Sequence, residues 1–203
     1  METSRPVVVV TGFGPFGIHS ENASWEAVKV LPDTNLENEC GIRLITKEIP
    51  VAYDEVDNIV PKLWEDYKPV LMVHAGVSHL AKHLILESCA NKSGYCSSDA
   101  KECKLLNGIN IIGEKENLKT NIDLNVIMSE AKEFSIDLSI SDDAHRYLCE
   151  YIYYTSLNIN CDRTIFIHVP MIGTNYSALR IAEHIKLIIK LTLKQLMGSG
   201  EHN

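Results

Sequence analysis

The segment Val7-Val8-Val9-Val10-Thr11-Gly12 decides the fold class of this chain. Its run of four valines predicts a strand that is buried on both faces, which is typical of parallel sheets covered by helices. A glycine-rich turn follows, and Asn22 can cap a helix over residues 23–31. The chain therefore begins with a strand, a turn and a helix.

Strands and helices continue to alternate along the chain. We expect strands at residues 42–49, 70–76, 83–90, 136–140 and 164–169, and helices at residues 54–67, 124–134, 144–157 and 177–197. Pro61 predicts a kink or a late start for the first of these helices, because proline removes a backbone donor. The polar stretch 91–110 shows no period, and we expect a long loop that covers a site or is mobile. The alternating order favours a parallel sheet flanked by helices.

Length and composition limit the classes of protein that are possible. The chain has 203 residues, of which 45% are hydrophobic and 23% charged, so we expect a single domain over residues 1–203 with a real core. The net charge of −8 repels phosphate backbones and anionic lipids, so nucleic acid and membrane surfaces are poor partners. The N-terminus lacks the pattern of a secretory signal, and no apolar run approaches the roughly 20 residues that span a bilayer. We expect a cytosolic protein that acts on a small or peptide-like substrate.

The cysteines are scattered and show no metal-binding pattern. No C-x-x-C pair occurs, and the spacing of six residues between Cys89, Cys96 and Cys103 is not that of common zinc sites. In a reducing compartment we expect most of the six cysteines to be free thiols, with no bound metal. The question is whether one of them is a nucleophile.

Three residues carry candidate chemistry. Cys149 falls early in a predicted helix, where the partial positive charge of the helix favours a thiolate, although a helix cysteine is more often a small buried hydrophobe. His168 ends a predicted strand, as a ligand-binding residue or as a histidine with a satisfied hydrogen bond. Glu87 lies in an otherwise apolar strand, either buried with a partner such as a histidine or facing solvent on an edge strand. A nucleophilic cysteine, a basic histidine and an orienting carboxylate together suit amide hydrolysis through a thioester.

The first turn, residues 11–17, places two aromatic residues among glycines. It matches neither the phosphate-binding G-x-x-x-x-G-K-[ST] motif nor the dinucleotide-binding motif. Phe13 and Phe16 could wall a small apolar pocket, or they could simply pack within the loop. A nucleoside phosphorylase would need a basic phosphate-binding cluster near the strand ends, and none is evident.

Several blocks of the sequence resemble one family, the pyroglutamyl-peptidase I (pyrrolidone-carboxylate peptidase) family of cysteine peptidases. The blocks are TGFGPFG at 11–17, NASW at 22–25, HAGVS at 74–78 leading to Glu87, DAHRYLC at 143–149, YYTSL at 153–157 and IHVP at 167–170. They occur in the family's order, so the resemblance is specific.

The resemblance implies an exopeptidase that removes an N-terminal pyroglutamyl residue from peptides without a metal or organic cofactor. It implies a three-layer α/β/α sandwich with a twisted, mostly parallel central sheet. By resemblance Cys149 is the nucleophile, His168 the general base and then acid, and Glu87 the residue that orients His168.

The resemblance also implies a pocket for the flat, uncharged lactam ring of pyroglutamate. Phe13 and Phe16 would enclose the ring, Asn22 would organise the pocket, and the Val77 backbone would bond the lactam. An ordinary N-terminal residue carries an ammonium group, which is costly to desolvate in an apolar slot without a counter-ion. We therefore hypothesise that specificity comes from rejecting charge.

The chain departs from the family pattern near the nucleophile and after Glu87. The family usually has Gly at the position of His145 and Asn or Asp at that of Glu150, and the Asn common five residues after Glu87 is Lys92 here. If position 145 is left-handed, histidine adopts that conformation at some cost. His145 could then intrude on the oxyanion site or supply an extra donor. The alternative function is a catalytically impaired relative that binds pyroglutamyl N-termini without cleaving them.

Overall fold

The structure is a computed structural model that describes residues 5–17 and 20–198, and the other positions of the predicted 1–203 domain lie outside the described residues. The strands are β1 (Val7–Phe13), β2 (Arg43–Ile49), β3 (Leu71–Val77), β4 (Leu84–Glu87), β5 (Cys89–Asn91), β6 (Asn117–Lys119), β7 (Leu138–Ser141) and β8 (Thr164–Val169). The α-helices are α1 (Ala23–Val30), α2 (Leu36–Cys40), α3 (Tyr53–Tyr67), α4 (Leu124–Glu133), α5 (Leu148–Ile159) and α6 (Ala178–Gly198). Short 3₁₀ helices lie at η1 (Leu31–Thr34) and η2 (Leu106–Gly108).

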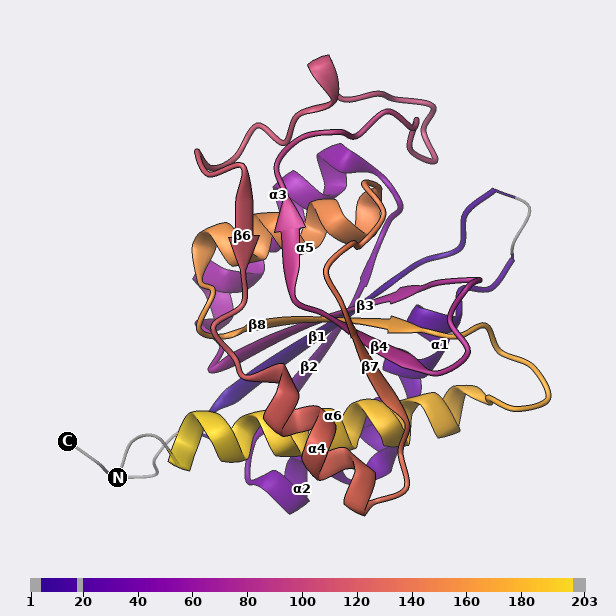
Figure 1. Cartoon of the computed structure of the whole chain (residues 1–203), viewed down its shortest axis with the longest axis vertical. Helices are drawn as coiled ribbons and strands as arrows, with labels where there is room; N and C mark the ends of the chain where they lie inside the picture. Colours follow the sequence, from indigo (N-terminus) through magenta and orange to yellow (C-terminus); the bar gives the residue numbers. More distant parts are fainter. Residues whose placement is uncertain (1–4, 18–19, 199–203) are drawn as a thin grey trace.

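Six strands form the central sheet in the order β2-β1-β3-β8-β4-β7. The first four are parallel to one another, β4 runs antiparallel to β8, and β7 is parallel to β4. Helices α3 and α5 cover one face of the sheet, and α1, α2, α4 and α6 lie on the other (Figure 1). This three-layer arrangement confirms the predicted fold class.

The first strand is buried on both faces, as its sequence predicts. Val8 and Val10 belong to the core on the α1 and α6 side, whereas Val9 packs in the core on the α3 and α5 side. All three side chains are fully buried. Alternate side chains of a strand point to opposite faces, so a continuous apolar run suits a strand with a helical layer on each side.

The single strand predicted at residues 83–90 is wrong, because the chain leaves the central sheet at Ser88. There the Ser88 amide N–H donates to the Ser141 carbonyl at 2.8 Å, and the next residues form β5. Strand β5 pairs with β6 in a separate two-stranded sheet. This pairing joins segments about thirty residues apart in the chain, and no local pattern in the sequence predicts it.

The segment between β5 and β6 extends over the α3 and α5 side of the molecule (Figure 1). The segment 91–110, for which a long loop was expected, is partly structured. It contains an isolated β-bridge between Ser93 and Ile109 and the short helix η2.

Two helix boundaries also differ from expectation. Helix α3 begins at Tyr53 and contains Pro61, so the predicted late start does not occur. Helix α5 begins at Leu148 rather than at residue 144, because His145 and Arg146 are left-handed, with φ of 73° and 48°. Cys149 is consequently the second residue of the helix, closer to its N-terminus than the sequence suggested.

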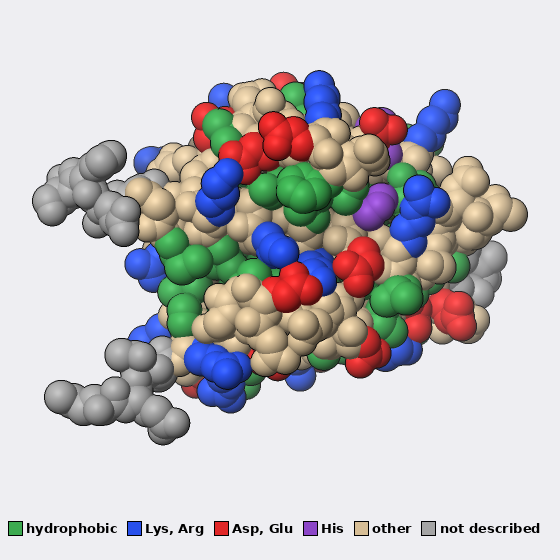
Figure 2. All heavy atoms as spheres, turned by 90° about the horizontal axis from the view of Figure 1, so that it is seen from below, with side chains coloured by type: hydrophobic (Ala, Val, Ile, Leu, Met, Phe, Trp, Pro, Cys, Tyr) green, Lys and Arg blue, Asp and Glu red, His purple; other side chains and the backbone are tan. Residues whose placement is uncertain are grey.

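The face formed by α2, α4 and α6 carries basic and acidic side chains interspersed with hydrophobic ones (Figure 2). Lys190 lies 2.7 Å from Glu39, and Lys194 lies 2.8 Å from Glu130. Such exposed ion pairs contribute little to stability. Within residues 5–17 and 20–198, no helix is both long and apolar enough to cross a membrane.

Candidate active site

A buried histidine–carboxylate pair joins the neighbouring strands β4 and β8 of the central sheet. Glu87 ends β4, His168 is the fifth residue of β8, and Oε1 of Glu87 lies 2.7 Å from Nδ1 of His168. The two side chains are 1% and 3% exposed. Strand β4 lies between β8 and β7, so the alternative of a solvent-facing edge-strand glutamate is wrong. Burial of a carboxylate requires a partner, and His168 is that partner.

Cys149 lies beside this pair at the start of α5. No side chain of the described residues caps the helix at Tyr147, and the Glu150 carboxylate of its first turn is paired with Arg146, so the N-terminal end keeps its partial positive charge next to the sulfur. Beneath the sulfur lies Gly76 of β3, where an added Cβ would come within 2.5 Å of the Cys149 Sγ and 2.8 Å of the Phe166 ring. Gly76 and His168 are register partners in adjacent strands. The absence of a side chain at Gly76 therefore creates the space in which Cys149 reaches His168.

The protonation of His168 reflects both of its neighbours. Burial of the ring lowers its pKa, but a hydrogen bond with Cys149 and the negative charges of Cys149 and Glu87 outweigh burial and raise the pKa to about 10. Glu87 occupies Nδ1, which leaves Nε2 for Cys149. This site therefore favours an imidazolium next to the sulfur, and an imidazolium stabilises a neighbouring thiolate.

A small cavity of about 60 Å³ adjoins Cys149 and is mostly apolar. We call it the inner slot. Its lining residues are Phe13, Phe16, Asn22, Val51, Val77, Tyr147, Leu148 and Cys149. All four residues predicted to bind substrate are among them.

Asn22 holds in place the turn after β1, which forms one wall of the inner slot. Its Oδ1 accepts the Ser24 amide N–H at 3.1 Å, which caps α1 as predicted, and its Nδ2 donates to the Gly14 carbonyl at 3.0 Å. One side chain therefore fixes both the helix start and the aromatic turn.

Sequence reasoning missed several residues of the site. Val51, Tyr147 and Leu148 line the inner slot, and Gly76 makes room for the sulfur. Tyr147 and Leu148 directly precede the nucleophile in the DAHRYLC block, which is the signal that could have identified them. Gly76 lies in the HAGVS block, but it carries no reactive group, and neither does Val51, so their roles follow only from their place in the fold.

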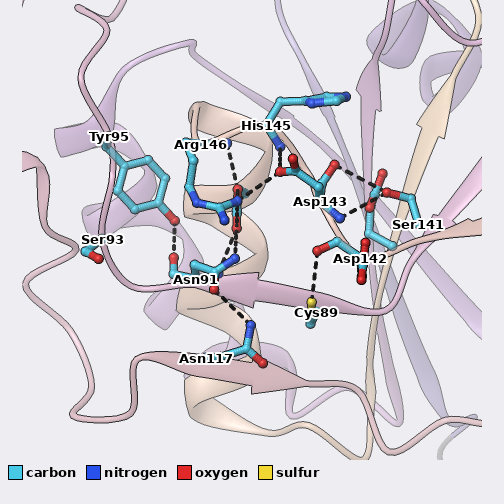
Figure 3. Close-up of polar contacts among 12 residues, drawn as sticks. Cys89, Asn91, Ser93, Tyr95, Asn117, Ser141, Asp142, Asp143, His145 and Arg146 are labelled. Carbon is cyan, nitrogen blue, oxygen red and sulfur yellow. Dashed lines mark hydrogen bonds and ion pairs between the residues drawn. The ribbon is translucent and has the colours of Figure 1, made fainter.

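The turn before Cys149 is held by a charged network (Figure 3). Glu150 is fully buried and accepts hydrogen bonds from the Arg146 guanidinium at 2.7 Å, the Arg146 amide N–H and the Asn91 side chain. This network joins the first turn of α5 to the end of β5. Two of the three departures from the family pattern thus lie close together, with His145 in the turn before α5 and Glu150 in the first turn of α5.

His145 is exposed and lies close to the histidine of the site. Its ring centroid is 5.9 Å from that of His168, and its amide N–H donates to Oδ1 of Asp143 at 3.0 Å. The left-handed conformation considered for this position is present, with φ of 73°. Across the described ranges, no group of three or more His, Cys, Asp and Glu side chains is placed to hold a metal ion.

A cysteine at a helix N-terminus, a histidine beside it and a buried carboxylate behind the histidine define a cysteine hydrolase on an α/β/α sandwich. The model of the pyroglutamyl peptidase family matches residues 6–185. Human pyroglutamyl-peptidase 1 is 40% identical over 203 residues, covering 98% of this chain and 95% of the human protein.

Solved structures agree on the fold. Pyrrolidone carboxyl peptidase from Thermococcus litoralis superposes with a TM-score of 0.85 at 19% identity, covering 96% of each chain. Pyroglutamyl peptidase I from Bacillus amyloliquefaciens gives a TM-score of 0.81 at 21% identity, covering 92% of this chain and 96% of that one. The chain belongs to the pyroglutamyl peptidase family, which confirms the resemblance found in the sequence.

Proposed function

We propose that this enzyme hydrolyses the amide bond after an N-terminal pyroglutamyl residue of peptides, with Cys149, His168 and Glu87 as its reacting and orienting groups. The observation that supports this most is the position of His168 between the Cys149 sulfur and the Glu87 carboxylate, beside the inner slot.

The reaction proceeds in two halves through a thioester. The Cys149 thiolate attacks the pyroglutamyl carbonyl carbon, and the oxyanion that forms is stabilised by amide N–H groups in the first turn of α5. The His168 imidazolium gives its proton to the leaving nitrogen, so the C–N bond breaks and the shortened peptide departs. His168 then takes a proton from water, the hydroxide attacks the thioester, and pyroglutamate is released as Cys149 is restored. Glu87 holds the imidazole orientation through both halves.

Specificity comes from the chemistry of the inner slot. None of the described residues that line it is Asp or Glu, and the Cys149 thiolate is already paired with the His168 imidazolium, so an N-terminal ammonium group would be desolvated there without a counter-ion of its own. The uncharged lactam of pyroglutamate avoids this cost, and the Phe13 and Phe16 rings suit its flat shape. Comparison of kcat/KM for pyroglutamyl and prolyl amides checks this, and equal values would refute charge rejection.

The free thiols support a cytosolic setting. All six cysteines are unpaired in the structure, as suits a reducing compartment and an enzyme that needs its own thiol. Fractionation of cells that make the protein, followed by detection of the native chain, checks this location.

Hydrolysis of a fluorogenic pyroglutamyl amide by wild type and by Cys149→Ala tests the proposed function. We expect turnover by wild type that an alkylating agent abolishes, and a loss of at least about 1,000-fold in Cys149→Ala. Cys161→Ala is the matched control, since Cys161 is also half-buried but lies outside the inner slot. Binding of a pyroglutamyl peptide without turnover by wild type would instead support the non-catalytic alternative.

A further inference from the structure

A second hollow, larger than the inner slot, adjoins the site. It has a volume of about 240 Å³, and we call it the outer groove. It is lined by Phe16, Glu21, Asn22, Ala23, Val77, His79, Met171 and Ile172. Phe16, Asn22 and Val77 line both hollows. The outer groove and the inner slot therefore meet along these three shared side chains.

The far wall of the outer groove comes from the connection that follows β8. Met171 and Ile172 are the third and fourth residues after His168, and they are 51% and 40% exposed. Both side chains line the outer groove, so they add exposed apolar surface to it next to the inner slot. Because these two residues follow His168 so closely in the chain, this wall of the outer groove lies near the histidine of the site.

The proposed reaction indicates which part of the substrate lies next to the outer groove. The inner slot has a volume of only about 60 Å³ and the Cys149 sulfur lines it, so the peptide beyond the scissile bond lies outside it. His168 has to reach the leaving nitrogen, so the chain beyond the scissile bond begins beside the end of β8, where Met171 and Ile172 follow.

We propose that the outer groove binds the side chain of the residue that follows the pyroglutamyl group, and that it prefers an apolar side chain there. This inference rests on the proposed function. Phe16, Val77, Met171 and Ile172 supply apolar walls, so a leucine side chain placed there loses water-exposed surface. An acidic side chain gains no such burial and lies near the Glu21 carboxylate.

The kcat/KM values for pyroglutamyl-leucine amide and pyroglutamyl-glycine amide test the assignment. We expect wild type to favour the leucine peptide by about tenfold, the size of effect that an apolar side chain produces in an apolar site. Met171→Ala, and Met171→Ala combined with Ile172→Ala, should reduce this ratio several-fold, the double variant more strongly. Met197→Ala is the matched control, because Met197 has the same residue type and 53% exposure but lies at the far end of α6.

The two-substrate ratio separates binding from folding. A variant that is merely destabilised loses activity on both peptides equally and leaves the ratio unchanged, and an unchanged ratio in the double variant overturns the assignment. Equal wild-type values for the two peptides also overturn it, while the proposed function stands. No hydrolysis of either peptide by wild type would reject the proposed function itself, and the groove assignment with it.

Discussion

Cys149 and the Glu87 carboxylate together keep His168 protonated near neutral pH. The 2.7 Å contact between Oε1 and Nδ1 places a negative charge against the ring in a site with little water. Cys149 acts from the other side, and together the two neighbours overcome the effect of burial, which alone would lower the pKa. Glu87 therefore both orients the His168 ring and helps to raise its pKa.

We expect Glu87→Gln to move the alkaline limb of the pH–rate profile to lower pH. The imidazolium must donate a proton to the leaving nitrogen, so activity falls as pH rises through the pKa of His168, which is about 10 in wild type. Glutamine removes a charge that raises this pKa, so the limb should shift down and kcat should drop by at least about tenfold. The dependence of kcat/KM on pH measures the limb. An unshifted limb would show that Glu87 does not set the charge of His168.

His145 occupies a backbone conformation that favours glycine. At φ of 73° an L side chain costs about 1 kcal/mol or more, and glycine is free of this cost. We expect His145→Gly to raise the melting temperature by about 2–4 °C. His79→Gly is the control, because His79 is also exposed but its φ is not positive, so glycine there should not stabilise the protein. A lower melting temperature for His145→Gly than for wild type would contradict the strain.

Strand β3 shapes the site because it has no side chain at Gly76. Gly76 leaves room for the Cys149 sulfur, and a side chain there would push the sulfur out of line with His168. Helix α5 supplies the sulfur and β8 the imidazole, so the reacting geometry depends on how closely α5 approaches β3.

We expect Gly76→Ala to lower kcat/KM by about 100-fold or more, because a displacement of about 1 Å at the reacting atoms has an effect of this size. The rate of Cys149 alkylation should change as well. Gly198→Ala provides the control, since an added Cβ at Gly198 meets no atom of the described residues within 4 Å. Wild-type activity in Gly76→Ala would mean that the sulfur can react from another position.

A buried polar network connects the layers of the molecule. His74 of β3 lies with Nδ1 2.7 Å from Oγ1 of Thr11 and with Nε2 2.6 Å from Oγ of Ser156, which also accepts the Trp64 indole N–H at 3.1 Å. The network thus joins β1 and β3 to the two helices on one face of the sheet. Burial lowers the pKa of His74 from 6.5 to about 3, so the ring is neutral in the folded protein.

We expect His74 to make the fold sensitive to acid. Between pH 6.5 and about pH 3 the unfolded chain binds a proton that the folded chain does not, so the stability due to neutral His74 is complete above pH 6.5 and falls as pH decreases. By pH 5 the loss should be about 2 kcal/mol. His74→Gln should be less stable than wild type at pH 7 but should lose less stability between pH 7 and pH 5.

Urea unfolding of both proteins at the two pH values measures these differences. His168 titrates in both proteins, so its contribution cancels in the comparison. An equal loss of stability in wild type and His74→Gln would exclude His74 as the source of acid sensitivity.

Local pattern was enough to predict most of the elements and the residues with reactive groups. The valine run of β1, the cap at Asn22 and the apolar strand of β8 depend on neighbours in the chain, so they are visible in the sequence. Cys149, His168 and Glu87 were candidates because few side chains can act as nucleophile, base and orienting acid. The boundary at Ser88 was missed, since β5 pairs with a strand far along the chain.

Residue types alone therefore determined the fold class, the family and the chemistry available to this protein, because hydrophobic period and functional groups are properties of the chain itself. Folding decided where those groups meet. The start of α5 after two left-handed residues, the space above Gly76 and the junction of the inner slot with the outer groove all depend on contacts between distant segments. Such contacts cannot be recognised from neighbouring residues in the sequence. The residues that line the two hollows, and the glycine that leaves space for the sulfur, mostly carry no reactive group.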